Sequence, residues 1–154
     1  MSDKNLTIDL DIVTLDKSLY SGTVKQIEAP TKMGKITVLP RHIPLITTLE
    51  PGELRLKVNE GEGIYAPDMI FIAIGGGFME VQPGNRVSVI ADSAERVDEI
   101  DEERAIAAKE KAEKLLKEFR EGKSKITEQE FASAAAQLAR ALTRLKVVRR
   151  KRKK

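Results

Sequence analysis

Hydrophobic and polar positions alternate over roughly the first 90 residues and follow a helical period after them. Between Leu6 and Ile12 every second residue is apolar, which is typical of a half-buried strand. Residues 69–74 are continuously apolar, as expected of a central strand that is buried on both faces. Pro51-Gly52 is a strong turn signal between two such runs. The pattern predicts eight to ten short strands in a sandwich or flattened barrel.

Residues 98 to 148 are expected to form two amphipathic helices folded back on each other. Thr127 and Glu130 fit a capping box, which fixes the start of the second helix, and Asp98 is the expected N-cap of the first. The polar connection 121–125 is short and suits antiparallel neighbours. The expected apolar stripes are Ala105, Ala108, Ala112, Leu115 and Phe119 in the first helix and Phe131, Ala134, Leu138, Leu142 and Leu145 in the second.

These stripes are narrow and rich in alanine, so a hairpin of the two helices buries little apolar area by itself. We therefore expect it to be marginally stable in isolation. It either docks on the β domain or leaves it for another partner. The predicted organisation is a β domain over residues 1–92, a two-helix domain over 93–148 and a basic tail over 149–154.

The net charge of +3 comes from the end of the chain. The last nine residues contain seven basic residues and no acid, so the rest of the chain is net negative. Such a tail is usually a solvated end that associates loosely with polyanions. An alternative function is a nucleic-acid-binding module that uses this tail.

Few features of the sequence indicate catalysis. The chain has no cysteine, which excludes disulfides and cysteine-based zinc sites. His42 is the only histidine and lies between prolines, and we interpret it as a loop residue. Gly75-Gly76-Gly77 precedes a strand rather than a helix, so it indicates close backbone packing at a turn and not a phosphate loop. We expect a non-catalytic, soluble cytoplasmic protein, without a signal peptide or a membrane span.

A group of charges on the helices is the best candidate binding site. Glu95, Asp101 and Arg104 lie at or just before the start of the first helix, and Arg140 and Arg144 are one turn apart on the second. An antiparallel hairpin brings these two ends together. Two arginines beside a helix N-terminus fit a polyphosphate group. The alternative is plain salt bridging between the helices, for example between Asp101 and Arg144.

Six segments, in order along nearly the whole chain, resemble one known family. They are Leu10-Asp11-Ile12-Val13, Val38-Leu39-Pro40-Arg41-His42-Ile43-Pro44-Leu45, Gly76-Gly77-Phe78-Met79-Glu80-Val81-Gln82-Pro83-Gly84, Val89-Ile90-Ala91-Asp92-Ser93-Ala94-Glu95-Arg96, Ile100-Asp101-Glu102-Glu103-Arg104-Ala105, and Gln137-Leu138-Ala139-Arg140-Ala141 with Arg144-Leu145. Together they resemble the epsilon subunit of bacterial and chloroplast F-type ATP synthases.

The resemblance implies a ten-stranded β-sandwich followed by a helical hairpin, in a peripheral subunit at the cytoplasmic face of the bacterial membrane, not inserted in it. The sandwich of this family binds the gamma subunit and rests on the c-ring. The hairpin either folds onto the sandwich or extends among the catalytic alpha and beta subunits, where it blocks ATP hydrolysis. In the extended position the basic end, with Arg149 and Arg150, faces acidic residues of the beta subunit.

The resemblance also implies a regulatory ATP site. Ile100 to Ala105 matches the family motif Ile/Leu-Asp-x-x-Arg-Ala, in which Ile100, Asp101, Arg104 and Ala105 are the defined positions. The family's further glutamate falls on Glu95, and its two helix arginines fall on Arg140 and Arg144. The c-ring-facing loop of the family corresponds to Gly34, Lys35 and His42. Here Lys35 and Arg41 replace a glutamate and a glycine of the usual pattern.

Overall fold

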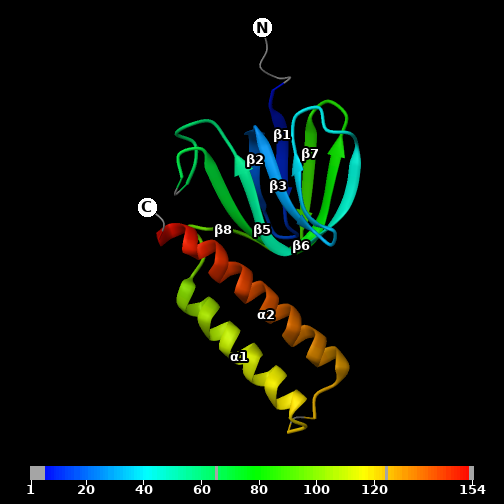
Figure 1. The fold of residues 1–154 in the computed structure, drawn as a ribbon, viewed down its shortest axis with the longest axis vertical. Coiled ribbons are helices and arrows are strands. Elements are labelled where there is room, and N and C mark those ends of the chain that lie inside the picture. The colour runs from blue at the N-terminus through cyan, green and yellow to red at the C-terminus, as the bar shows by residue number, and fades with distance from the viewer. Residues whose placement is uncertain (1–5, 65, 124, 153–154) are drawn as a thin grey trace.

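The computed structural model describes residues 6–64, 66–123 and 125–152, and shows a β-sandwich that stands on a helical hairpin (Figure 1). Residues 153 and 154 of the expected tail lie outside the described residues. The strands are β1 (Ile8–Val13), β2 (Ser18–Val24), β3 (Gln26–Thr31), β4 (Gly34–Val38), β5 (Leu45–Lys57), β6 (Met69–Gln82), β7 (Arg86–Ala91) and β8 (Ala94–Arg96). The helices are α1 (Glu102–Arg120), α2 (Glu128–Val148) and the short 3-10 helix η2 (Arg149–Arg152).

The strands form one sheet that folds over on itself. Its order is β2-β1-β7-β6-β5-β3-β4, and β8 pairs with β6 from outside this path. The described residues contain eight strands, whereas the family resemblance implied ten. In the structure β5 and β6 each join two runs that the sequence separates. β8 lies beyond the expected domain boundary at residue 92 and belongs to the sheet by its pairing.

The long strands β5 and β6 pair along their whole length and bend together. Leu45 pairs with Val81 at one end and Lys57 with Met69 at the other, while Pro51 pairs with Gly75 in the middle. The turn predicted at Pro51-Gly52 is therefore wrong: these residues continue a strand through its bend. Because the two strands bend together, the backbone hydrogen bonds between them are kept. One sheet can then supply both layers of a sandwich.

The glycines of β6 allow this bend. Gly76 and Gly77 have φ angles of 103° and 134°, which side chains rarely adopt. A Cβ at Gly77 would lie 2.1 Å from the carbonyl oxygen of Ile90 on β7. The prediction of close backbone packing at the triple glycine is confirmed, although the segment is a bent strand rather than a turn.

Strand β6 is buried on both faces, as its apolar run predicts. Ile70, Ile72 and Ile74 point into the sandwich core with the inward residues of the other strands. The alternate residues Phe71 and Ala73 point outward and are buried in a second cluster. We call this group the docking cluster; it comprises Phe71, Ala73, Val97, Ile100, Val147 and Val148.

The antiparallel hairpin forms as expected, but α1 begins later than predicted. Asp101, not Asp98, is its N-cap, and its carboxylate accepts a hydrogen bond from the backbone N–H of Arg104 at 3.1 Å. Asp98 instead forms an ion pair with Arg96 at 3.3 Å, in the turn that leaves β8. Thr127 and Glu130 form the predicted capping box of α2.

The buried faces of the helices follow the predicted stripes only in part: Ala105, Ala112 and Ala134 are buried as expected, but the leucines differ. Leu116 is the buried leucine of α1, and Leu115 is only half-buried. On α2, Leu142 is 45% exposed, whereas Ala141, Thr143, Val147 and Val148 are buried. The reason is that α2 packs against β5 and β6 as well as against α1. None of the described helices is long and apolar enough to cross a membrane.

The close approach at Gly77 predicts a large, position-specific loss of stability. We expect Gly77→Ala to lower the free energy of unfolding by about 3 kcal/mol or more, because the methyl group adds a clash to an unfavourable φ. Gly34→Ala is the control: Gly34 has a similar φ of 104° but no atom within 4 Å of the added Cβ. It should cost about 1–2 kcal/mol. Urea unfolding of both variants checks this, and equal losses would contradict the role of the packing.

Candidate functional site

The predicted charges converge where the open end of the hairpin meets the sheet. A hollow of about 210 Å³ lies there, lined by Glu95, Glu99, Asp101, Arg104, Ala105 and Arg144. Glu95 comes from β8, Arg104 and Ala105 from the first turn of α1, and Arg144 from α2. The structure therefore brings five of the seven predicted ATP-site residues around one hollow. Glu99, which the sequence analysis did not select, is the remaining lining residue.

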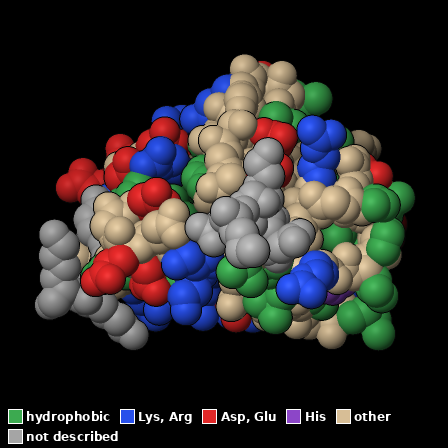
Figure 2. Space-filling model, turned by 90° about the horizontal axis from the view of Figure 1, so that it is seen from above, with side chains coloured by type: hydrophobic (Ala, Val, Ile, Leu, Met, Phe, Trp, Pro, Cys, Tyr) green, Lys and Arg blue, Asp and Glu red, His purple; other side chains and the backbone are tan. Residues whose placement is uncertain are grey.

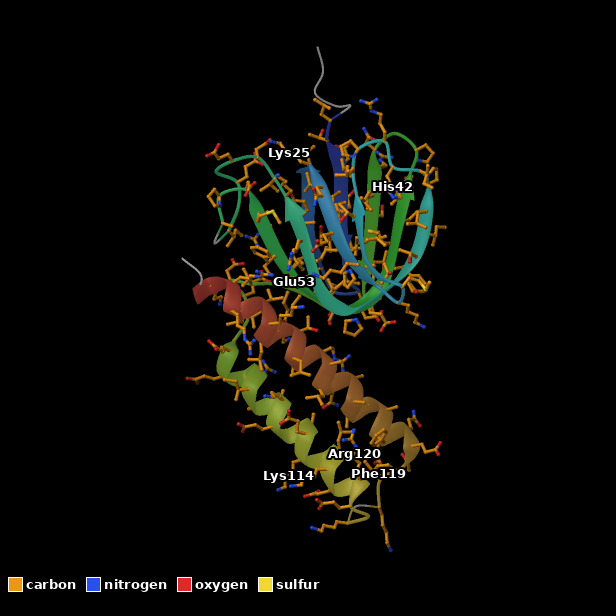
Figure 3. The ribbon with its side chains drawn as sticks, in the orientation of Figure 1. Lys25, His42, Glu53, Lys114, Phe119 and Arg120 are labelled. Carbon is orange, nitrogen blue, oxygen red and sulfur yellow. The ribbon has the colours of Figure 1, made fainter. Side chains whose placement is uncertain are left out.

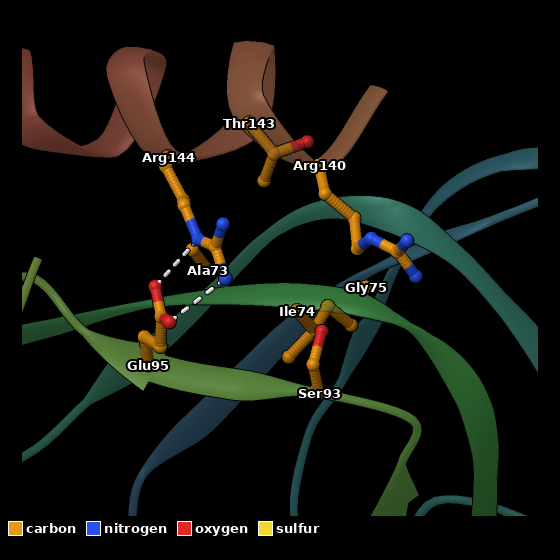
Figure 4. Close-up of a pocket in the computed structure, with 8 residues that line it drawn as sticks. All are labelled: Ala73, Ile74, Gly75, Ser93, Glu95, Arg140, Thr143 and Arg144. Carbon is orange, nitrogen blue, oxygen red and sulfur yellow. Dashed lines mark hydrogen bonds and ion pairs between the residues drawn. The ribbon is translucent and has the colours of Figure 1, made fainter. Parts of the chain in front are cut away.

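Arg144 forms a bidentate ion pair with Glu95 across the boundary between hairpin and sandwich (Figure 4). Its Nε and Nη2 donate to the two carboxylate oxygens at 2.7 and 2.8 Å. The salt-bridge alternative named Asp101 as the partner of Arg144. The pair forms with Glu95 instead, and the Asp101 carboxylate caps α1. Salt bridging at this site thus joins the helix to the sheet rather than helix to helix.

Arg140 lies one turn earlier on α2 and beside the hollow rather than in its lining. Its aliphatic part crosses Gly75, where an added Cβ would lie 3.1 Å from its Cδ. Its guanidinium points away from Arg144 (Figure 4). A second, smaller hollow of about 10 Å³ separates the two arginines, room for about one water molecule. It is lined by Ala73, Ile74, Gly75, Ser93, Glu95, Arg140, Thr143 and Arg144.

Ile100 does not line the hollow. Its side chain is 5% exposed and packs in the docking cluster, against the end of α2. Ala105 is also buried, but it reaches the hollow from the first turn of α1. In this structure the apolar position that opens the family motif therefore holds the start of α1 against the sheet.

The basic end of the chain makes a contact that the sequence does not predict. Arg150 donates through Nε and Nη2 to the two carboxylate oxygens of Glu53 on β5, at 3.2 and 3.0 Å. Its guanidinium carbon also lies 5.0 Å from the ring centroid of Phe71. Figure 3 shows Glu53 at the base of the sheet, beside the end of α2. Arg149 is exposed.

Glu53 is a buried carboxylate, with its side chain 0% exposed. Burial acts to raise its pKa, but the hydrogen bonds and charges of Arg150 and Arg55 outweigh this effect and hold the pKa below its ordinary value. Glu53 is therefore ionised at neutral pH. The same pairing raises the pKa of Arg150. No sequence signal distinguishes Glu53, because the helix that covers it is distant in the chain.

The residues expected in one c-ring-facing loop lie at the two ends of a strand. Gly34 begins β4 and Lys35 follows it, whereas His42 lies four residues beyond the end of that strand. They therefore do not form one continuous loop, and their contact with a c-ring stays a prediction. Lys35 forms an ion pair with Glu28 at 3.5 Å. His42 lies at the end of the sandwich remote from the helices (Figure 3), where exposed hydrophobic side chains gather beside it (Figure 2); Leu39 and Ile43 are 51% and 75% exposed.

Comparison with known proteins assigns both parts of the chain. Residues 7–97 match the β-sandwich domain of the ATP synthase delta/epsilon chain, and residues 98–149 match its long alpha-helix domain. The chain is 44% identical to the ATP synthase epsilon chain of Nitrosococcus oceani over 97% of each chain. It is 42% identical to that of Herpetosiphon aurantiacus, over 96% of this chain and 98% of the relative.

Solved structures agree in fold. A chain of the Euglena gracilis mitochondrial ATP synthase superposes with a TM-score of 0.69 at 24% identity, over 87% of this chain and 76% of that one. A chain of the Tetrahymena thermophila mitochondrial ATP synthase, from its central stalk and c-ring, gives 0.57 at 15% identity, over 92% and 96%. The family matches cover the sandwich and the hairpin in turn. The chain therefore belongs to the ATP synthase delta/epsilon chain family, as its resemblance to the epsilon subunit predicted.

Proposed function

We propose that this chain is the regulatory epsilon subunit of a proton-translocating F-type synthase, whose hairpin is held in its folded position by ATP. The observation that carries this proposal is the composition of the hollow. Glu95 belongs to the sandwich, Arg104 to α1 and Arg144 to α2. A ligand that contacts all three binds only while the hairpin is docked.

Such a ligand shifts the docking equilibrium by linkage. A ligand that binds only the docked form stabilises it by about 2.7 kcal/mol at a hundredfold excess over its Kd. That free energy moves a two-state equilibrium by roughly a hundredfold. In this proposal high ATP holds the hairpin down and permits hydrolysis, and low ATP releases it to inhibit.

Two arginines of the hollow, Arg104 and Arg144, supply a place for the phosphates beside the carboxylates of Glu95, Glu99 and Asp101. The Arg104 side chain is exposed and has no ion-pair partner among the described residues, and it extends from the first turn of α1, where the helix dipole favours anions. Arg144 would share its guanidinium between Glu95 and a phosphate. The hollow of about 210 Å³ is below the roughly 300–1,000 Å³ of drug-sized ligand pockets. We therefore place the polyphosphate between the arginines and the base and sugar on the open surface.

The proposed partners follow from family membership. The sandwich would bind the gamma subunit and rest on the c-ring at the cytoplasmic face of the membrane. The extended hairpin would reach the catalytic alpha and beta subunits and present Arg149 and Arg150 to acidic residues of the beta subunit. The alternative of a nucleic-acid-binding tail is weaker, because Arg150 is committed to Glu53 and Lys151 donates to the carbonyl of Ile100 at 3.4 Å.

Calorimetric titration of ATP into the intact chain tests the site. We expect saturable binding at one site, weakened about tenfold or more in Arg144→Ala and in Arg104→Ala, because each loses a charge-assisted hydrogen bond to phosphate. Arg120→Ala is the matched control, since Arg120 lies at the far end of the hairpin (Figure 3). Asp101→Ala is less suitable because it also removes the cap of α1. Absence of heat at millimolar ATP with the intact chain would refute the nucleotide site and leave a subunit controlled by other means.

Hydrolysis by the assembled synthase tests the linkage. Arg104→Ala should weaken ATP binding and deepen the inhibition of hydrolysis at intermediate ATP, because the docked form loses its ligand. The variant should approach the unmodified enzyme once ATP is raised far above the new Kd. Weaker binding with unchanged inhibition would show that ATP occupancy does not control the hairpin.

A further inference from the structure

Glu53 is unusual among the acidic residues because its buried side chain points toward the helices. Glu53 pairs with Ala73 in the β5–β6 ladder, and its neighbour Leu54 lies in the sandwich core. The Glu53 carboxylate therefore belongs to the outer face, the one that α2 covers. Covered in this way, it needs fixed hydrogen-bond donors, since an unpaired buried charge is strongly destabilising.

Two arginines supply these donors. Arg55, on the same face of β5, donates from Nε to Oε1 at 2.5 Å. Arg150 donates to both oxygens, and its guanidinium lies over the ring of Phe71. Of these two, Arg150 is the one that joins the sandwich to the helical part, and the sequence separation between Glu53 and Arg150 is 97 residues.

The surroundings make this contact more than a surface ion pair. The last turn of α2 places Val147 and Val148 in the docking cluster, and Arg150 follows Val148 by two residues. The next residue, Lys151, reaches the Ile100 carbonyl in the segment that leads into α1. The end of the chain is thus held by an apolar contact, a bidentate ion pair and a cation–π contact within a few residues.

We propose that Glu53, Arg55 and Phe71 form a seat for the guanidinium of Arg150, and that this seat latches the hairpin to the sandwich without any nucleotide. Occupation of the seat also withholds Arg150 from an acidic partner, so a docked hairpin cannot use this residue elsewhere. The latch goes beyond the proposed ATP control, because it acts in the free chain and uses other residues. Its second part, the withholding of Arg150 from the beta subunit, rests on the proposed function.

The latch has a physical basis: undocking removes the two hydrogen bonds that Arg150 donates to the buried Glu53 carboxylate. When Arg150 leaves, Glu53 keeps Arg55, which it shares with Glu28 at 3.2 Å. Water must replace the bidentate partner and cover the face of Phe71. Glu95–Arg144 is a separate pair, with side chains 34% and 32% exposed, and such open pairs contribute little. The seat is the more buried of the two charged contacts and should hold the hairpin more strongly.

A double-mutant cycle on the nucleotide-free chain tests the latch. The sequence contains no cysteine, so Ala73→Cys supplies a single thiol beneath the end of α2, at a side chain 6% exposed. Its rate of modification by a thiol reagent reports undocking. In this background we compare Glu53→Gln, Arg150→Gln and their combination. Lys146→Gln is the control, since it removes one exposed positive charge from the last turn of α2.

We expect each single substitution to raise the modification rate by about tenfold, because either one removes the charge-assisted pair. The modification rate of the double variant should be only slightly higher than that of the faster single variant, because both substitutions remove the same interaction. Lys146→Gln should leave the rate unchanged. Multiplicative effects in the double variant, or an unchanged rate in Arg150→Gln, would overturn the latch. Arg150 lies at the chain end outside the sandwich core, so its substitution remains decisive even where Glu53→Gln disturbs the sheet.

The withholding of Arg150 from an acidic partner is tested in the assembled synthase with Glu53→Gln. This variant keeps Arg150 in the chain but removes the carboxylate that holds it. Inhibition of hydrolysis should deepen, whereas Arg150→Gln should open the hairpin without the same gain in inhibition. If thiol modification accelerates and inhibition does not change in Glu53→Gln, withholding is refuted and the latch stands. The double-mutant cycle uses no ATP, so its result holds even if the chain does not bind nucleotide. If ATP binds as proposed but the Glu53 and Arg150 substitutions act independently, only the latch is overturned.

Discussion

The structure depends on covering the outer face of the bent β5–β6 pair. The inward side chains of these strands fill the sandwich core, but Phe71, Ala73 and Glu53 project to the other side. An apolar ring on an open face of the sheet is unfavourable in contact with water, and a carboxylate beside that ring needs hydrogen-bond donors. Helix α2 covers them with small residues, two arginines and its apolar last turn. The position of the hairpin follows from this requirement, and so does the convergence of charges at its open end.

The attachment of α2 to the sheet combines a small apolar contact with charged contacts. The docking cluster contains alanine and valine beside single larger residues, so it removes a modest apolar area from water. The rest of the attachment is charged. Glu95, Arg144 and Arg150 remain partly accessible, and water can replace much of what they lose on separation. A contact of this kind has a free energy that one ligand or one competing partner can offset.

The sequence determines the local elements more clearly than their contacts across the chain. The capping box at Thr127, the two-faced burial of β6 and the convergence of Glu95, Arg104 and Arg144 all follow from spacing, and the structure confirms them. The bend at Pro51-Gly52 is not predicted, because a paired strand can bend where an isolated segment would turn. The burial of Ala141 and Thr143 on α2, and the exposure of Leu142, depend on the sheet as a second neighbour of α2, which periodicity within a helix cannot reveal.

Glu53 shows that contacts between distant segments also hide functional residues from sequence analysis. In an alternating strand a glutamate next to Leu54 is expected to face solvent, and here it is buried because α2 covers this face of the sheet and Arg150 pairs with the carboxylate. The basic tail, in turn, is an unassigned charge run until that carboxylate is located. The hairpin is thus held at two separated charged points, Glu95–Arg144 at the hollow and Glu53–Arg150 at the chain end. The two points differ in burial, because the Glu53 side chain is 0% exposed whereas those of Glu95 and Arg144 are about one-third exposed. A ligand that acts at the first point leaves the second in place, so the more buried contact at the chain end attaches the hairpin independently of the hollow.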